Sequence, residues 1–339
     1  MPVTVRSFAK INLGLSIGPR RPDGFHDLRT VYQTIALHDR LRVEVGRGSG
    51  IEIDCADPRV PAGPANTCHR VAELVLAALK TRARVRIHIE KRLPVQGGLG
   101  AASSNAVATM FALERTLKKR LSPAARQSIA AEVGSDLPLF LIGGTILGVG
   151  RGEEVYPLPD LLPLPCVLVT PQIAVSTPAA FAAWDRLEDH VPPADLVADR
   201  PGKRARNAKL TPPAASDKIS LSGYALSAWL AGTATGVPGR VRGRDRAEAL
   251  LLDLVRAGIA NDFERVVFSE HPELGELKRL LERLGAGYAS LSGSGSALYG
   301  LFARRDKAQR AAARLRKLGV PAVATLTLSR RAYWQRLWA

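Results

Sequence analysis

The chain has few of the features that mark secreted or membrane-spanning proteins. Its 339 residues include only three cysteines, Cys55, Cys68 and Cys166, an odd number at wide spacing with no CxxC pair. This pattern fits neither a disulfide framework nor a metal cluster, so we expect buried, unpaired thiols in a reducing cytoplasm. The most apolar segment, residues 137–149, is short and holds three glycines, which argues against a membrane span. Lys10 interrupts the apolar N-terminal stretch and argues against a secretory signal.

Two common nucleotide-binding fingerprints are also absent. The chain contains no GxGxxG, and none of its glycine-rich loops ends in Gly-Lys-Ser or Gly-Lys-Thr. These absences exclude a Rossmann-type dinucleotide site and a Walker A phosphate loop.

Positive charge is in excess. The chain has 48 Lys and Arg against 31 Asp and Glu, and residues 199–246 alone carry ten basic and three acidic residues. A basic surface attracts polyanions, including phosphorylated metabolites. Nucleic-acid-binding surfaces usually combine such charge with aromatic residues or a helix face, whereas this stretch is rich in Pro, Gly, Ala and Ser. We therefore interpret about 190–246 as a solvated basic insertion, with nucleic-acid contact as the less favoured alternative.

Hydrophobic periodicity indicates alternating strands and helices, which favours an α+β protein with lobes at 1–160 and 161–339. The predicted strands are 3–7, 12–17, 31–37, 41–45, 84–89, 144–149, 166–170, 288–292, 297–302 and 320–328. The predicted helices are 66–80, 103–119, 122–133, 177–187, 246–256, 262–269, 273–284 and 307–318.

The strongest local signal is the segment LPVQGGLGAASSN at residues 93–105, which joins a predicted strand to a predicted helix. Glycines allow backbone amides to approach an anion closely, and the following helix directs its N-terminal amides at the same point. The Ser-Ser-Asn that follows adds side chains, one of which could reach a metal ion on the phosphates. A plain glycine-rich turn is the alternative, but the ordered combination favours a nucleotide phosphate site.

Two isolated charges are candidates for phosphoryl-transfer chemistry. Asp136 lies in Gly-Ser-Asp-Leu-Pro, and Lys10 lies among apolar strand residues. Buried charges need partners, so we expect these two to pair and to direct the lysine at the γ-phosphate of a nucleotide. The alternatives are a turn or capping aspartate and an edge-strand lysine.

Two further polar segments are weaker candidates. Phe25 and His26 follow an Asp-Gly turn and offer an aromatic face beside a hydrogen-bonding ring, which suits a flat base. A surface histidine is the alternative, and composition alone favours it. The segment LSGSGS at residues 291–296 is typical of a tight hairpin, and it could also line the phosphate end of a substrate.

Three separated segments together resemble the GHMP kinase superfamily. They are AKINLGLSIGPRRPDGFHDL from residue 9, LPVQGGLGAASSNA from residue 93 and LSGSGSALYG from residue 291. The resemblance implies an α+β, two-lobed fold with an N-terminal ribosomal-protein-like lobe and a C-terminal ferredoxin-like lobe. The Pro-Asp-Gly-aromatic-His and Gly-Ser-Asp-x-Pro segments narrow the resemblance to one branch of this superfamily, whose members act in the non-mevalonate isoprenoid pathway. Members of that branch use ATP to phosphorylate the hydroxyl on carbon 2 of 4-diphosphocytidyl-2-C-methyl-D-erythritol.

The resemblance also implies roles for individual residues. Asp136 would accept the proton of the substrate hydroxyl, and Lys10 would hold this carboxylate and stabilise the transferring phosphoryl group. The cytidylated substrate would be bound by Asn12, Phe25, His26 and Phe181, with the two phenylalanines enclosing the cytosine and the histidine reading its edge. The ATP site would be lined by Asn66, Pro94, Gly97, Gly98, Leu99, Gly100, Ala101, Ala102, Ser103, Ser104 and Asn105.

The implied cofactors are ATP and Mg²⁺, without a dedicated protein metal site. The implied partner is the small cytidylated substrate, with neither a membrane nor a nucleic acid involved, and the family includes monomers and homodimers. The chain departs from the family at Gln96, Ala101 and Ala102, where glycine is common. Alanine there requires negative φ angles or a small displacement of the phosphates, which predicts weaker ATP binding. The alternatives are a homoserine or phosphomevalonate type of kinase, and a basic nucleic-acid-binding protein.

Overall fold

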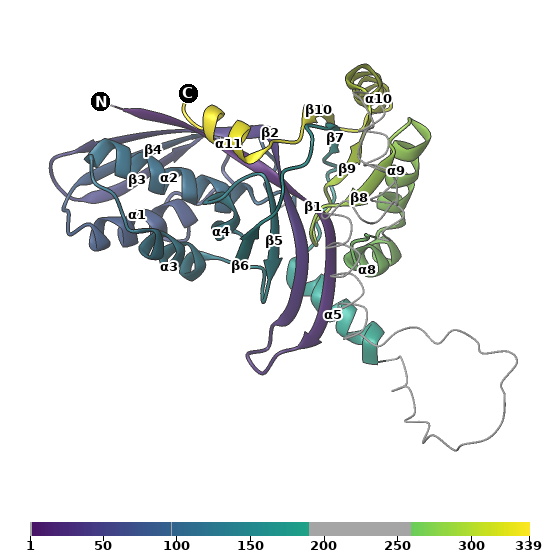
Figure 1. Cartoon of the computed structure of the whole chain (residues 1–339), viewed down its shortest axis with the longest axis horizontal. Coiled ribbons are helices and arrows are strands. Elements are labelled where there is room, and N and C mark those ends of the chain that lie inside the picture. Colours follow the sequence, from purple (N-terminus) through teal and green to yellow (C-terminus); the bar gives the residue numbers. More distant parts are fainter. Residues whose placement is uncertain (1, 96, 190–258) are drawn as a thin grey trace, which may run out of the picture.

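The computed structural model describes residues 2–95, 97–189 and 259–339. The basic stretch, the predicted helix 246–256 and Gln96 lie outside these described residues. Within them, two long strands run between two groups of helices, and Figure 1 shows them as one curved hairpin.

The hairpin consists of β1 (Val3–Arg20) and β2 (His26–Gly46), paired antiparallel over most of their length. The sequence predicted two short strands in place of each, and that prediction is wrong. The polar residues suggested that each strand ends there, but β-bulges accommodate polar residues within β1. The register shifts between Phe8 and Lys10 and again between Asn12 and Gly14. The strand therefore continues past a buried lysine.

The first lobe is built on a sheet in the order β3-β4-β2-β5-β6, to which β1 adds by pairing with β2. β4 alternates buried and exposed residues, as its period-two pattern predicted, and the buried side chains contact the helices. The additional strands are β3 (Gly50–Cys55), β4 (Arg84–Glu90), β5 (Thr145–Val149) and β6 (Glu154–Pro157). The helices are α1 (Thr67–Ala78), α2 (Ala101–Leu117), α3 (Pro123–Val133) and α4 (Leu137–Phe140).

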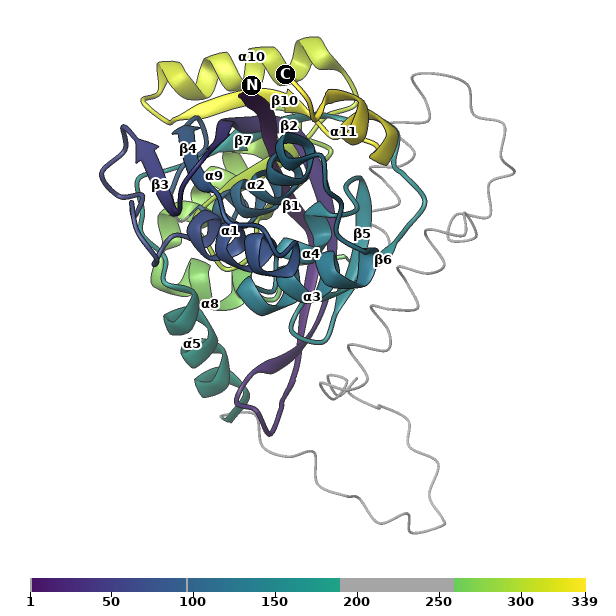
Figure 2. The ribbon, with the colours of Figure 1, turned by 90° about the vertical axis from the view of Figure 1, so that its left-hand side faces the viewer.

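The second lobe is a four-stranded antiparallel sheet in the order β10-β7-β9-β8, packed with helices around its own apolar core. Its strands are β7 (Pro165–Val169), β8 (Tyr288–Leu291), β9 (Leu298–Leu301) and β10 (Ala322–Leu326). Its helices are α5 (Thr177–Asp189), α8 (Phe263–Glu270), α9 (Pro272–Arg283) and α10 (Arg305–Lys317). The predicted two-lobed α+β architecture is confirmed, while the division at residue 160 stays a prediction. Figure 2 shows α10 and α5 at opposite ends of the molecule.

The three cysteines are unpaired, and two of them are buried as expected. Burial raises the pKa of both Cys68 and Cys166 to about 12, so these thiols stay protonated at neutral pH. None of the helices in the described residues is long and apolar enough to cross a membrane.

The last helix of the structure was not predicted from the sequence. α11 (Arg330–Arg336) returns to the first lobe, where its Tyr333 is buried against Phe8 with ring centroids 5.4 Å apart. The Tyr333 hydroxyl donates a hydrogen bond of 2.7 Å to the carbonyl of Phe140 in α4. Because α4 follows the candidate residue Asp136, this helix braces the segment that carries a predicted site residue.

The buried Tyr333 gives a first prediction. We expect Tyr333→Ala to lower the free energy of unfolding by about 3–5 kcal/mol, since it removes a large buried ring and leaves a cavity. Urea denaturation of the purified protein measures this change. The control is Val323→Ala in β10, where the side chain is 47% exposed and the expected loss is below about 0.5 kcal/mol. Equal small losses in both variants would contradict the packing role of α11.

Candidate active site

The glycine segment forms a loop that ends at the first turn of α2, and its backbone requires glycine. Gly98 and Gly100 have φ angles of +74° and +66°, in the left-handed region. A Cβ atom on Gly98 would lie 2.2 Å from the carbonyl oxygen of Ser292, and one on Gly100 would lie 2.9 Å from the Phe140 ring. Ala101 and Ala102 begin the helix with the negative φ angles that alanine requires.

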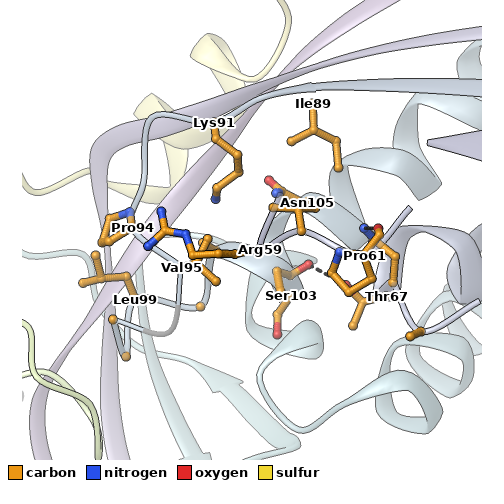
Figure 3. A pocket seen from close by; sticks show the side chains of 18 residues that line it. Arg59, Pro61, Thr67, Ile89, Lys91, Pro94, Val95, Leu99, Ser103 and Asn105 are labelled. Carbon is orange, nitrogen blue, oxygen red and sulfur yellow. Dashed lines mark hydrogen bonds between the residues drawn. The ribbon is translucent and has the colours of Figure 1, made fainter. Parts of the chain in front are cut away.

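A pocket of about 300 Å³ lies against this loop. Arg59 and Lys91 are the basic residues that line it, and in Figure 3 the ammonium of Lys91 points toward the guanidinium of Arg59, which lies between Pro94 and Ser103. Asn66 lines the pocket and caps α1, accepting a hydrogen bond from the backbone of Cys68. The predicted ATP-site residues that line it are Asn66, Pro94, Gly97, Gly98, Leu99, Gly100, Ala101, Ala102, Ser103 and Asn105. Ser104 is the exception, because its hydroxyl is buried against that of Ser7.

The sequence analysis missed Asp39, a fully buried carboxylate that holds both ends of the loop. Asp39 Oδ1 accepts hydrogen bonds from the backbone of Arg92 (2.7 Å) and Leu93 (2.8 Å), before the loop. Asp39 Oδ2 accepts one from Asn105 Nδ2 (3.1 Å), after the loop, and pairs with the ammonium of Lys91. A single acid in a strand gave no sequence signal for this role, because its partners are far along the chain.

Lys10 and Asp136, the predicted pair, do meet. Lys10 Nζ lies 3.4 Å from Asp136 Oδ2, and the lysine side chain is only 5% exposed. Lys10 Nζ also donates a 2.7 Å hydrogen bond to Asn12 Oδ1, and the Lys10 backbone donates to the carbonyl of Leu99 in the glycine loop. The buried ammonium is therefore paired, and it lies directly beside the loop that begins α2.

Asp136 precedes α4 without capping it, since its side chain makes no capping hydrogen bond. Its other oxygen, Oδ1, accepts a 3.1 Å hydrogen bond from the hydroxyl of Tyr32. Burial, reinforced by the charge of Asp136, raises the pKa of Tyr32 well above its usual value, so the phenol stays a donor at neutral pH. The carboxylate is thus held from two sides, by the Tyr32 hydroxyl and by the Lys10 ammonium.

Tyr32 was also missed, although the sheet register explains its place. Asn12 pairs with Tyr32 across the β1–β2 ladder, and Lys10 pairs with Thr34, so these side chains share one face of the hairpin. A Cβ atom on Gly148 would lie 2.5 Å from the Tyr32 ring, so the glycine makes room for it. The register, unlike the identity of the residues, could not be read from the sequence.

The third glycine segment connects β8 to β9 and lies against the first. The Ser292 hydroxyl donates to the carbonyl of Gly98 at 3.1 Å. A Cβ atom on Gly293 would lie 3.5 Å from Lys10 Nζ, and the side chain of Asn261 donates to the carbonyl of Gly293. The hairpin that was predicted at this segment also forms a wall of the site.

The predicted base-binding residues all lie near the tip of the hairpin, but only His26 and Phe181 are in contact with each other. The imidazole of His26 stacks on Phe181 with centroids 5.3 Å apart and an interplanar angle of 11°. His26 Nδ1 donates to the carbonyl of Gly18, and Nε2 lies 2.9 Å from Asp185 Oδ1 on α5. Phe25 is 53% exposed and packs against the guanidinium of Arg151 instead, with no ring contact to Phe181 in the part of the chain that is described.

The arrangement has the parts that phosphoryl transfer to an alcohol requires. The start of α2, which no side chain caps, suits the phosphates of a nucleotide, a buried cation lies beside it, and a carboxylate contacts the cation. Among the described residues no cluster of His, Cys, Asp and Glu is arranged to hold a metal ion alone.

Both the N-terminal and the C-terminal part of the chain match a known protein family. The family model for the GHMP kinases N terminal domain matches residues 66–144, and that for GHMP kinases C terminal matches residues 246–320. The 4-diphosphocytidyl-2-C-methyl-D-erythritol kinase of Solibacter usitatus is 37% identical over 98% of this chain and 91% of its own length. The protein of the same name from Moorella thermoacetica is 35% identical over 96% of this chain and 99% of its own.

Solved structures agree. A crystal structure of 4-(cytidine 5'-diphospho)-2C-methyl-D-erythritol kinase superposes with a TM-score of 0.69 at 31% identity, covering 96% of this chain and all of that one. Homoserine kinase from Cytophaga hutchinsonii shares the fold at 16% identity, with a TM-score of 0.67 and 97% of this chain and 95% of that one covered. The chain therefore belongs to the 4-diphosphocytidyl-2-C-methyl-D-erythritol kinase family of the GHMP kinases.

Proposed function

We propose that this chain transfers the γ-phosphoryl group of ATP to the hydroxyl on carbon 2 of 4-diphosphocytidyl-2-C-methyl-D-erythritol. The observation that carries the proposal is the contact between Lys10 and Asp136 beside the glycine loop. The relatives named above, which share more than a third of their residues with this chain over almost its whole length, support the choice of acceptor.

In this proposal Asp136 orients the acceptor hydroxyl and receives its proton. Lys10 stabilises the negative charge of the group in transfer, which is the main task of a kinase site because the transition state is loose. Tyr32 fixes the carboxylate through its hydrogen bond to Oδ1, leaving Oδ2 beside the ammonium. Asn12 keeps the ammonium oriented through a second contact.

The ATP phosphates would lie over the loop and the first turn of α2, with the basic side chains of Lys91 and Arg59 lining the same pocket. Mg²⁺ fits the same end of the pocket, where Ser103 lines the wall and the buried side-chain oxygen of Asn105 has no hydrogen-bond partner in the described chain. Held by these two residues and the phosphates, the ion would neutralise phosphate charge during transfer.

The cytosine would bind at the other end of the site, near the hairpin tip. Aromatic faces stack on flat bases, and Phe181 and His26 offer such faces. The carboxylate of Asp185 is an acceptor suited to the exocyclic amino group of cytosine, and His26 already holds it. In this proposal Phe25, which is exposed in the structure, closes over the base from the solvent side.

A coupled assay for ADP release tests the acceptor directly. We expect rapid turnover with 4-diphosphocytidyl-2-C-methyl-D-erythritol and little with homoserine or phosphomevalonate, because only the first carries a base for the hairpin tip. Faster turnover with either of the other acceptors would overturn the proposed substrate while leaving the kinase assignment intact.

The reacting carboxylate gives a second prediction. We expect Asp136→Asn to lower kcat by about 10²–10⁴-fold, since the amide can neither accept the proton nor pair with Lys10. ATP affinity, measured by calorimetry, should stay within about threefold, because Asp136 does not line the ATP pocket. Full turnover in this variant would contradict the assigned role. The control is Glu52→Gln, a surface acid on β3 for which no change is expected.

The base-binding end gives a third prediction. We expect His26→Ala to raise KM for the cytidylated substrate by about tenfold or more, and to leave KM for ATP nearly unchanged, since His26 is remote from the glycine loop. Steady-state kinetics with each substrate varied in turn separates the two effects. Equal increases in both KM values would remove His26 from base recognition.

The buried acid behind the loop gives a fourth prediction. Asp39→Asn keeps the shape of the side chain but removes the charge that holds Lys91 and must present a donor where the carboxylate accepts four hydrogen bonds. We expect KM for ATP to rise by about tenfold or more, with a smaller effect on KM for the acceptor. Kinetics on samples shown to be folded by circular dichroism measures this, and an unchanged KM for ATP would refute the positioning role.

A further inference from the structure

A second pocket, of about 380 Å³, lies at the opposite end of α2 from the glycine loop. Three arginines, two tryptophans, Phe111 and Glu114 line it, and none of these residues lines the ATP pocket. α2 has 17 residues and is therefore roughly 25 Å long at about 1.5 Å per residue, so this pocket is separate from the site described above.

The pocket carries uncompensated positive charge. Its one acid, Glu114, is buried and fully engaged: its carboxylate accepts hydrogen bonds from Arg126 at 3.0 Å and from the backbone of Leu121 at 2.7 Å. The guanidinium groups of Arg115 and Arg120 form no hydrogen bond or ion pair with the described residues, and both side chains are exposed. Two cations thus face the pocket without a counter-charge.

Its walls are aromatic and held in place. The guanidinium of Arg115 stacks over the Trp338 ring at 4.3 Å. Trp334 packs against Phe111 with centroids 5.3 Å apart, and its indole N–H donates to the carbonyl of Ile142, which fixes the ring while 38% of the residue remains exposed. An exposed aromatic face anchored in this way loses little conformational entropy when a flat ligand packs on it.

We propose that this pocket binds a small organic phosphate that carries a flat ring. Guanidinium groups match the geometry of phosphate oxygens, and Arg115 and Arg120 are free to donate to them. Indole faces stack on flat rings, and the volume lies within the roughly 300–1,000 Å³ usual for small-molecule sites. The phosphate and the ring would both contribute to binding, because the pocket has positive charge and aromatic surface side by side.

Calorimetric titration with phenyl phosphate tests the proposal, on the full chain with its ATP pocket saturated by ADP. Inorganic phosphate and benzyl alcohol serve as the charge-only and ring-only probes. We expect phenyl phosphate to bind at least about tenfold more tightly than either, with an affinity that falls as salt is added. No measurable binding at millimolar phenyl phosphate, or equal affinity for phenyl phosphate and inorganic phosphate, would overturn the proposal.

Variants localise the binding. We expect Arg120→Ala, and the double variant Arg115→Ala with Arg120→Ala, to weaken phenyl phosphate binding progressively, by about tenfold or more in the double variant. Arg331→Ala removes an exposed cation from α11 outside the pocket and should leave the affinity unchanged. All three should retain kinase activity, which confirms folding. Full affinity in the double variant, or an equal loss in Arg331→Ala, would refute the site.

Discussion

The close approach of the glycine loop to strand β1 is the constraint on which the rest of the site depends. The backbone of Lys10 donates a hydrogen bond to Leu99 in the loop. A Cβ atom on Gly100 would lie 2.9 Å from the Phe140 ring and 3.1 Å from Lys10 Cγ. Only a residue without Cβ allows the start of α2 to lie against a strand that carries a buried ammonium. The contact therefore brings a buried cation next to a helix start of the kind that suits an anion.

The buried ammonium of Lys10 is stable in the fold because neighbouring side chains pair with it. Burying an isolated charge costs several kcal/mol, so Lys10 must keep Asp136 and Asn12 as partners. The same requirement fixes Asp136, which is held by Lys10 on one oxygen and by Tyr32 on the other. The same contacts meet the structural need to pair a buried cation and the need of the proposed reaction for a positioned carboxylate.

The β1–β2 hairpin relates the two ends of the site. It carries Lys10, Asn12 and Tyr32 in its middle and His26 near its tip, while α5 of the second lobe brings Phe181 and Asp185 to that tip. Figure 1 shows the hairpin extending below the first lobe, with α5 of the second lobe beside it. Residues far apart in sequence are thus set along one continuous strand pair, whose stiffness fixes their separation.

The sequence by itself determined much of the secondary structure and indicated the main residues of the candidate site. Lys10, Asp136 and the glycine loop were recognisable because each breaks a local rule: a charge inside an apolar strand, an acid among small residues, glycines between a strand and a helix. Such conflicts between local preference and position are typical of functional sites. The period-two pattern of β4 and the start of α3 at Pro123 were likewise local signals, and the structure matches them.

Only the tertiary structure decided the continuity of β1 and β2, the return of α11 and the roles of Asp39 and Tyr32. Whether a strand continues through a bulge depends on its pairing with the partner strand. A short basic helix such as α11 is stable because Tyr333 packs in the core of the first lobe. Asp39 and Tyr32 act through partners 53 to 104 residues away, at the loop and at Asp136. Local sequence specifies which backbone conformations have low free energy. Contacts between distant segments select among these conformations, and those contacts exist only once the chain has folded.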